Sequence, residues 1–233
     1  MPLLITAAII QQQYFMRTDI NSKLKLGQLS KRYYCPESEV DLASLTRFEK
    51  VYTKIVETPN EGAADAALDI AEAIERCVEE RGRCVIGFGA GKGVLEVYDE
   101  LVRLYFADKV SFAKVVAFNI SELGFGQQAT ESQNNFRRLQ ERLFNKIDID
   151  PSNVYTIDEG ATKENVHRYC KQYETLIDSF GGIDLLVCQL TKNGGLAFNE
   201  PGSQSTSSCR LVLLSNDTRQ RIADSYQCEV APD

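Results

Sequence analysis

A glycine-rich segment, Gly87–Gly93, separates a short apolar run from an amphipathic stretch, and its residue types suit the binding of an anion. Glycine lets the backbone approach a ligand closely, and the first N–H groups of a following helix point at that ligand. The predicted phosphate-binding residues are Gly89, Gly91, Lys92 and Gly93. Neither the Walker A pattern nor G-x-G-x-x-G fits this spacing. The alternative is a tight strand–helix turn that needs glycine only for its backbone geometry.

A carboxylate, Glu200, is the second candidate, because it lies in a loop at 191–203 that follows the long apolar run 183–190. In parallel α/β sheets, ligands bind at the carboxyl ends of strands. A carboxylate in that place can move a proton or polarise a hydroxyl group. Glu200 is therefore the candidate catalytic residue, although a lone loop glutamate is more commonly a solvated surface group.

Apolar periodicity predicts alternating helices and strands from about residue 43 onward. The start of the first helix is indicated by Thr58 as N-cap, Pro59 at the first helical position and Glu61 to close a capping box. Strands that alternate with helices predict a three-layer α/β fold with a mainly parallel sheet. Residues 1–40 lack a clear period and are predicted to be an N-terminal arm, with one domain over 41–233. The predicted helices are 61–80, 94–106, 132–146, 163–180 and 217–226, and the predicted strands are 83–89, 115–120, 154–157, 183–190 and 210–215.

The charge balance excludes some classes of partner. The 233 residues carry 26 Lys and Arg against 33 Asp and Glu, a net charge of −7, without clusters of basic residues. Nucleic-acid grooves and anionic membrane surfaces select for dense Lys and Arg, so neither partner is expected. The apolar run at 2–10 is too short to span a bilayer.

The seven cysteines show no C-x-x-C pair, and the chain has one histidine, His167. A zinc site is therefore not expected. Scattered cysteines in apolar runs indicate small buried hydrophobic residues in a reducing compartment, which predicts a cytoplasmic protein. His167 lies in the middle of the predicted helix 163–180 and is expected to be a surface or boundary residue, not a catalyst.

Four segments form a recognisable pattern: Leu196–Ser203, Phe180–Leu185, Val115–Asn119 and Asp217–Arg219. They resemble the glucosamine-6-phosphate deaminase/isomerase family, which is related to the 6-phosphogluconolactonases. The resemblance extends in order from about residue 58 to 225, and the segments at 31–34 and 45–50 look like the start of longer bacterial proteins that carry a deaminase-like domain at their N-terminus. It implies a Rossmann-like αβα sandwich that holds a sugar phosphate without a metal or nucleotide cofactor.

The chain departs from the family at the residues that move protons. In active members, the resemblance implies, an Asp after the Phe-Asn pair moves a proton at C2, and an Asp-Gly-His group with the Glu of Asn-Glu-Pro opens the sugar ring. Here Ser121 replaces the first Asp, and Asn193 and Gly195 replace the Asp and His of the triplet. Of the four, only Glu200 remains.

The phosphate end departs as well. A Thr-Gly-Gly-Thr-like loop in the family corresponds to Ala90–Gly93 here, which loses hydroxyl donors and gains the charge of Lys92. An arginine of the family falls near Tyr226, and the chain ends at Asp233, before the family's last strand–helix region.

Three functions are consistent with this pattern. The first is a sugar-phosphate-binding domain with weak or lost deaminase activity. The second is an active deaminase, or a related sugar-phosphate isomerase, that uses Glu200. The third is a non-catalytic interaction module, in which a homo-oligomer or a downstream domain covers the sheet edge near the C-terminus. Whether the chain is an enzyme is left open by the sequence.

Overall fold

The computed structural model of the chain describes Ser38, Val40 and residues 53–123, 134–157, 162, 164–191, 193–204 and 206–226. The predicted arm at 1–40, apart from those two residues, lies outside the described residues. The segment 45–50 and the chain end after Tyr226 also lie outside them. The domain boundary at residue 41 therefore stays a prediction.

A four-stranded parallel sheet in the order β3-β2-β1-β4 lies at the centre of the fold. The central pair is in register from Cys84 opposite Val115 to Phe88 opposite Asn119, and every residue of these two strands is buried. The expected parallel α/β fold is confirmed. The strands are β1 Cys84–Phe88, β2 Val115–Asn119, β3 Val154–Tyr155 and β4 Leu185–Val187.

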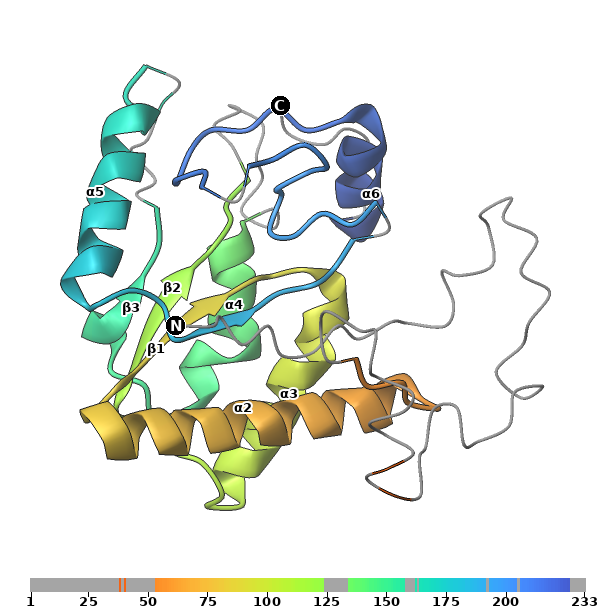
Figure 1. Cartoon of the computed structure of the whole chain (residues 1–233), viewed down its shortest axis with the longest axis vertical. Coiled ribbons are helices and arrows are strands. Elements are labelled where there is room, and N and C mark those ends of the chain that lie inside the picture. The colour runs from red at the N-terminus through yellow and green to blue at the C-terminus, as the bar shows by residue number, and fades with distance from the viewer. Residues whose placement is uncertain are drawn as a thin grey trace.

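Helices cover both faces of the sheet, which gives three layers (Figure 1). On one face, α2, α3 and α4 pack against Ile86, Phe88 and Ala117. On the other, Tyr173 of α5 packs against Val85 and Phe118. A third cluster joins α6 to Leu123, Phe198 and Leu214. The helices are α2 Pro59–Arg81, α3 Leu95–Phe106, α4 Asn135–Arg142, α5 Val166–Ser179 and α6 Asn216–Tyr226.

The first long helix, α2, begins and ends where local signals place it. The Thr58 hydroxyl accepts a hydrogen bond from the Glu61 N–H at 3.2 Å, as an N-cap does. The Glu61 carboxylate accepts the N–H of Glu57 at 3.2 Å, one residue before the partner of an ideal capping box. Gly82, at φ 74°, ends the helix in the left-handed conformation.

Three expectations need correction. Residues 210–215 form no strand, and Leu213 is 91% exposed. The predicted helix 132–146 divides into α4 and a 3₁₀ turn at Phe144–Lys146. His167 is exposed as expected, but it is the second residue of α5 and does not lie in the middle of a helix.

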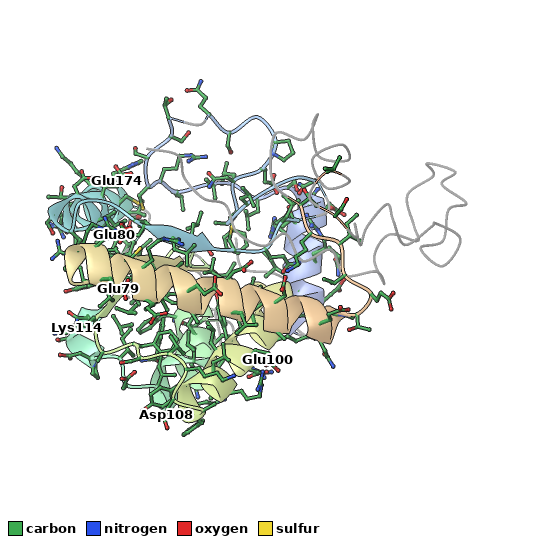
Figure 2. All side chains as sticks on the ribbon, turned by 60° about the horizontal axis from the view of Figure 1, so that its bottom comes forward. Glu79, Glu80, Glu100, Asp108, Lys114 and Glu174 are labelled. Carbon is green, nitrogen blue, oxygen red and sulfur yellow. The ribbon has the colours of Figure 1, made fainter. Side chains whose placement is uncertain are left out.

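Several charged side chains lie on the outside of the fold. Glu79 and Glu80 on α2, and Asp108 and Lys114 between α3 and β2, are exposed and project from the rim of the molecule (Figure 2). Among the described residues, no helix is long and apolar enough to cross a bilayer.

Candidate functional site

Most of the candidate residues follow the carboxyl ends of three parallel strands, at one end of the sheet (Figure 1). Gly89 follows β1, Ser121 follows β2 and Gln189 follows β4. This is the end at which parallel sheets bind ligands, because the chain reverses there and exposes its loops.

The glycine loop, residues 87–93, is held in place by its neighbours. The Gly89 N–H donates to the carbonyl of Val187 at 2.8 Å, and the buried Tyr98 hydroxyl donates to the Gly89 carbonyl. From α4, an Arg138 guanidinium N–H donates to the Ala90 carbonyl at 3.2 Å. Arg138 therefore places a positive charge directly beside the loop, a role that the sequence suggested for the exposed Lys92.

One side chain from the segment after β4 lies against this loop. The Gly93 N–H donates to the Gln189 Oε1 at 2.9 Å. A Cβ atom on Gly91 would lie 2.7 Å from the same oxygen, and one on Gly93 would lie 3.0 Å from the Gln189 Cδ. Glycine at 91 and 93 thus makes room for Gln189, which sequence reasoning missed because a glutamine after a strand carries no pattern of its own.

The segment after β2 carries a partly buried carboxylate, Glu122, that was also missed. Its two oxygens accept the N–H groups of Asn135 and Phe136 at the start of α4, at 2.9 and 3.0 Å. They also accept the Leu123 N–H at 2.9 Å and the Asn119 side-chain amide at 3.0 Å. Burial raises the pKa of Glu122, and these hydrogen bonds oppose the shift. The group therefore fastens α4 to the end of the strand.

Residues 193–195 lie in a tight turn. The Thr191 N–H donates to the Gly195 carbonyl at 2.9 Å, and the Asn193 Oδ1 lies 2.6 Å from the Thr191 hydroxyl. A Cβ atom on Gly195 would lie 2.8 Å from both the Asn199 carbonyl oxygen and the Thr191 hydroxyl oxygen. The backbone at position 195 leaves no space for a larger side chain.

Glu200 binds the start of α6. Its carboxylate accepts the Ser215 hydroxyl at 2.9 Å and the Ser215 N–H at 3.2 Å. A hydrogen bond from Thr218, together with those from Ser215, lowers the pKa of Glu200, so the group is ionised at neutral pH. The turn before it is strained, since Ala197 and Phe198 have φ angles of 49° and 64°.

The predicted site residues therefore fall into two groups. Gly89, Gly91, Lys92 and Gly93 share one loop, and Gln189 joins them through its side chain. The hydrogen bonds of Glu200 lead to the N-terminus of α6 instead. The lone histidine lies on α5, in a different part of the chain.

The cysteines were expected to be scattered, yet the fold brings four of them into two pairs. The Cys77 and Cys84 sulfurs and an oxygen of Asp184 lie within 4.8 Å of one another. Asp184 already forms an ion pair with Arg81 and accepts the Val85 N–H at 2.8 Å. The positive charge of Arg81 would repel a metal cation at this place, so we interpret the cluster as structural. In the second pair, the free thiols of Cys209 and Cys170 are hydrogen-bonded, and burial raises the pKa of Cys209 to about 12.

Comparison with known proteins adds the family context. Residues 57–218 match the family described as glucosamine-6-phosphate isomerases/6-phosphogluconolactonase. The chain is 40% identical over 212 residues to a glucosamine-6-phosphate deaminase-like protein of Bacteroides thetaiotaomicron, covering 91% of this chain and 32% of the relative. Glucosamine-6-phosphate deaminase 1 of Giardia intestinalis is 34% identical over 155 residues, 66% of this chain and 57% of the relative.

A solved structure agrees with the sequence matches. A monomeric glucosamine-6-phosphate deaminase superposes with a TM-score of 0.68 at 27% identity, covering 76% of this chain and 71% of that one. The chain spans about a third of one curated relative and just over half of the other.

Proposed function

The chain belongs to the glucosamine-6-phosphate isomerase/6-phosphogluconolactonase family, and we propose from this that it is a sugar-phosphate-binding domain with weak or lost deaminase activity. The proposal covers the domain predicted at 41–233. Both curated relatives carry deaminase in their names, which supports an amino-sugar phosphate as the ligand.

The observation that carries the proposal is the turn at 193–195. A proton shuttle needs an imidazole or carboxyl group that can reach the reacting oxygen. Position 195 is glycine, and a Cβ there would meet two oxygens at 2.8 Å. Position 193 is an amide, whose oxygen is engaged with Thr191 and with the Gly195 N–H. The groups that would share a proton with Glu200 are therefore replaced, and the turn is packed around the replacements.

Ser121, which replaces the Asp that the resemblance assigns to proton transfer at C2, supports the same conclusion. A hydroxyl is a weak base unless an adjacent group accepts its proton. The carboxylate next in sequence, Glu122, accepts four hydrogen bonds and fastens α4, so it already has a structural role. Removing one member of a set of groups that act together lowers the rate by orders of magnitude.

The test is a thermal-shift titration of the full chain with glucosamine 6-phosphate, N-acetylglucosamine 6-phosphate and fructose 6-phosphate, with ammonia release assayed in parallel. A ligand that binds the native state raises the melting temperature by mass action, whether or not it is converted. A shift without ammonia is the expected result. Turnover comparable to an ordinary deaminase contradicts the loss of activity, and the absence of any shift contradicts the binding function.

A second candidate, an active deaminase or isomerase that uses Glu200, is favoured by one observation. The lowered pKa keeps this carboxylate ionised, so it can accept a proton or orient a hydroxyl group. If the chain is active, Glu200→Gln abolishes turnover while Glu79→Gln, a matched change on the exposed side of α2, does not (Figure 2). Equal rates in the two variants exclude this mechanism.

A further inference from the structure

The glycine loop holds a side chain of the protein where a ligand oxygen would bind. The Gln189 Oε1 accepts the Gly93 N–H at 2.9 Å, and a Cβ on Gly91 would approach that oxygen to 2.7 Å. Backbone N–H groups at the start of a helix also bind phosphate oxygens in proteins, so Gln189 holds a donor that a phosphate could use.

We propose that Gln189 is an intramolecular competitor for the phosphate group of the ligand and so sets the affinity and selectivity of the loop. The proposal rests on the proposed function, in which this loop takes the phosphate of a sugar phosphate. In the free protein the carboxamide satisfies the Gly93 N–H, and a ligand binds only after the side chain has moved away.

The surroundings allow this exchange. Gln189 lies beyond the end of β4 and is only partly buried, so its side chain can turn toward solvent without opening the core. The carboxamide is neutral, whereas a phosphate monoester carries up to two negative charges and gains from Arg138, which contacts the loop at the Ala90 carbonyl. A dianion can therefore displace the glutamine, and a neutral sugar lacks the charge to do so.

If Gln189 instead helped to bind the phosphate, its removal would change the dissociation constant in the opposite direction. If Gln189 keeps its place and donates its amide N–H to the phosphate, its removal weakens binding. If Gln189 competes, its removal tightens binding by the value of one neutral hydrogen bond, about three- to tenfold in the dissociation constant.

The experiment measures the dissociation constants of inorganic phosphate and glucosamine 6-phosphate by isothermal titration calorimetry with the full chain. Gln189→Ala is expected to bind both about three- to tenfold more tightly than the wild type. Gln189→Glu keeps an acceptor for the Gly93 N–H and adds a negative charge, so it is expected to bind both more weakly. Gln172→Ala, the same change at an exposed position on α5, is expected to leave both constants unchanged.

Amide hydrogen exchange of the ligand-free proteins separates the two proposals. The Gly93 amide is expected to exchange faster in Gln189→Ala than in the wild type, because its acceptor has been removed. If the wild type binds glucosamine 6-phosphate and Gln189→Ala binds it equally or more weakly, competition is wrong and the proposed function stands. If neither protein binds while the Gly93 exchange is faster in the variant, the contact is real, but both the competition and the proposed function are wrong.

Discussion

Replacing Gly195 by asparagine tests whether the turn at 193–195 is as closely packed as the structure indicates. A Cβ at position 195 would lie 2.8 Å from the Asn199 carbonyl and the Thr191 hydroxyl, where ordinary contacts begin near 3.4 Å. The Asn199 oxygen is a backbone atom, so the backbone must shift by several tenths of an ångström to make room. Such overpacking lowers the free energy of unfolding by about 1–3 kcal/mol. For a chain of this size, about 2 kcal/mol lowers the melting temperature by roughly 4–8 °C.

The neighbouring glycine provides a matched control. Gly194 has a φ of 81°, a Cβ added there would meet nothing within 4 Å, and asparagine tolerates this left-handed conformation. We expect Gly194→Asn to lower the free energy of unfolding by less than about 1 kcal/mol. Both variants are measured by urea denaturation with circular dichroism. If Gly195→Asn is as stable as Gly194→Asn, the turn has room for a side chain, and the reasoning that excludes a proton shuttle at 195 is refuted.

Three further substitutions test contacts that hold the sheet and its neighbouring helices together. Glu122→Gln is expected to lower the free energy of unfolding by about 1–3 kcal/mol, because an amide NH₂ group then faces N–H donors. Burial raises the folded-state pKa of Glu122, so the wild type is stabilised most at low pH, below about 4.3. The difference in the free energy of unfolding between the wild type and Glu122→Gln is therefore expected to decrease as the pH rises through the folded-state pKa. Urea denaturation between pH 4 and 8 measures this difference. Tyr173→Phe removes the hydroxyl that donates to the Asn119 carbonyl at 2.9 Å, and we expect a loss of about 1–2 kcal/mol in urea denaturation; an unchanged midpoint contradicts this. Asp184→Asn weakens the acceptor of the Val85 N–H and removes the ion pair with Arg81. We expect it to lower the free energy of unfolding by about 1–3 kcal/mol, and we expect high salt to reduce this loss without abolishing it.

Elements with local signals could be predicted from the sequence. The start of α2 follows from Thr58 and Pro59, which fix the N-cap and the first helical turn without help from the rest of the fold. Its end follows from Gly82, which adopts the left-handed conformation at little energetic cost. The strands β1 and β2 are equally clear, because a strand buried on both faces is apolar throughout.

The error at 210–215 has the opposite cause. A strand exists only if a neighbouring strand accepts and donates its hydrogen bonds, and an apolar run does not reveal whether such a neighbour is present. Here Arg210 at the start of the run bonds the side chains of Asn199 and Ser203, at 2.9 and 3.2 Å. These hydrogen bonds hold the segment against the loop that contains Asn199 and Ser203, so the segment does not extend the sheet.

The candidate site was predictable at the level of loops but not of contacts. The position of the glycine loop between β1 and α3 follows from the order of elements, and so does the loop that carries Glu200. Gln189 binds Gly93, which lies 96 positions earlier in the chain, and Arg138 binds Ala90, which lies 48 positions earlier. Such long-range contacts depend on the register of packed elements, which no local pattern encodes.

The two parts of the site lead to different expectations about binding and catalysis. A general base works best when its pKa lies near the working pH, and such a carboxyl group is usually buried or paired with another acid. Glu200 has the reverse environment, since hydrogen bonds from Thr218 and Ser215 lower its pKa. An imidazole at position 195 would need space that two oxygens occupy. The glycine loop keeps its backbone donor and a nearby guanidinium group, neither of which depends on proton transfer. We therefore expect recognition of a sugar phosphate to be retained where its conversion is not.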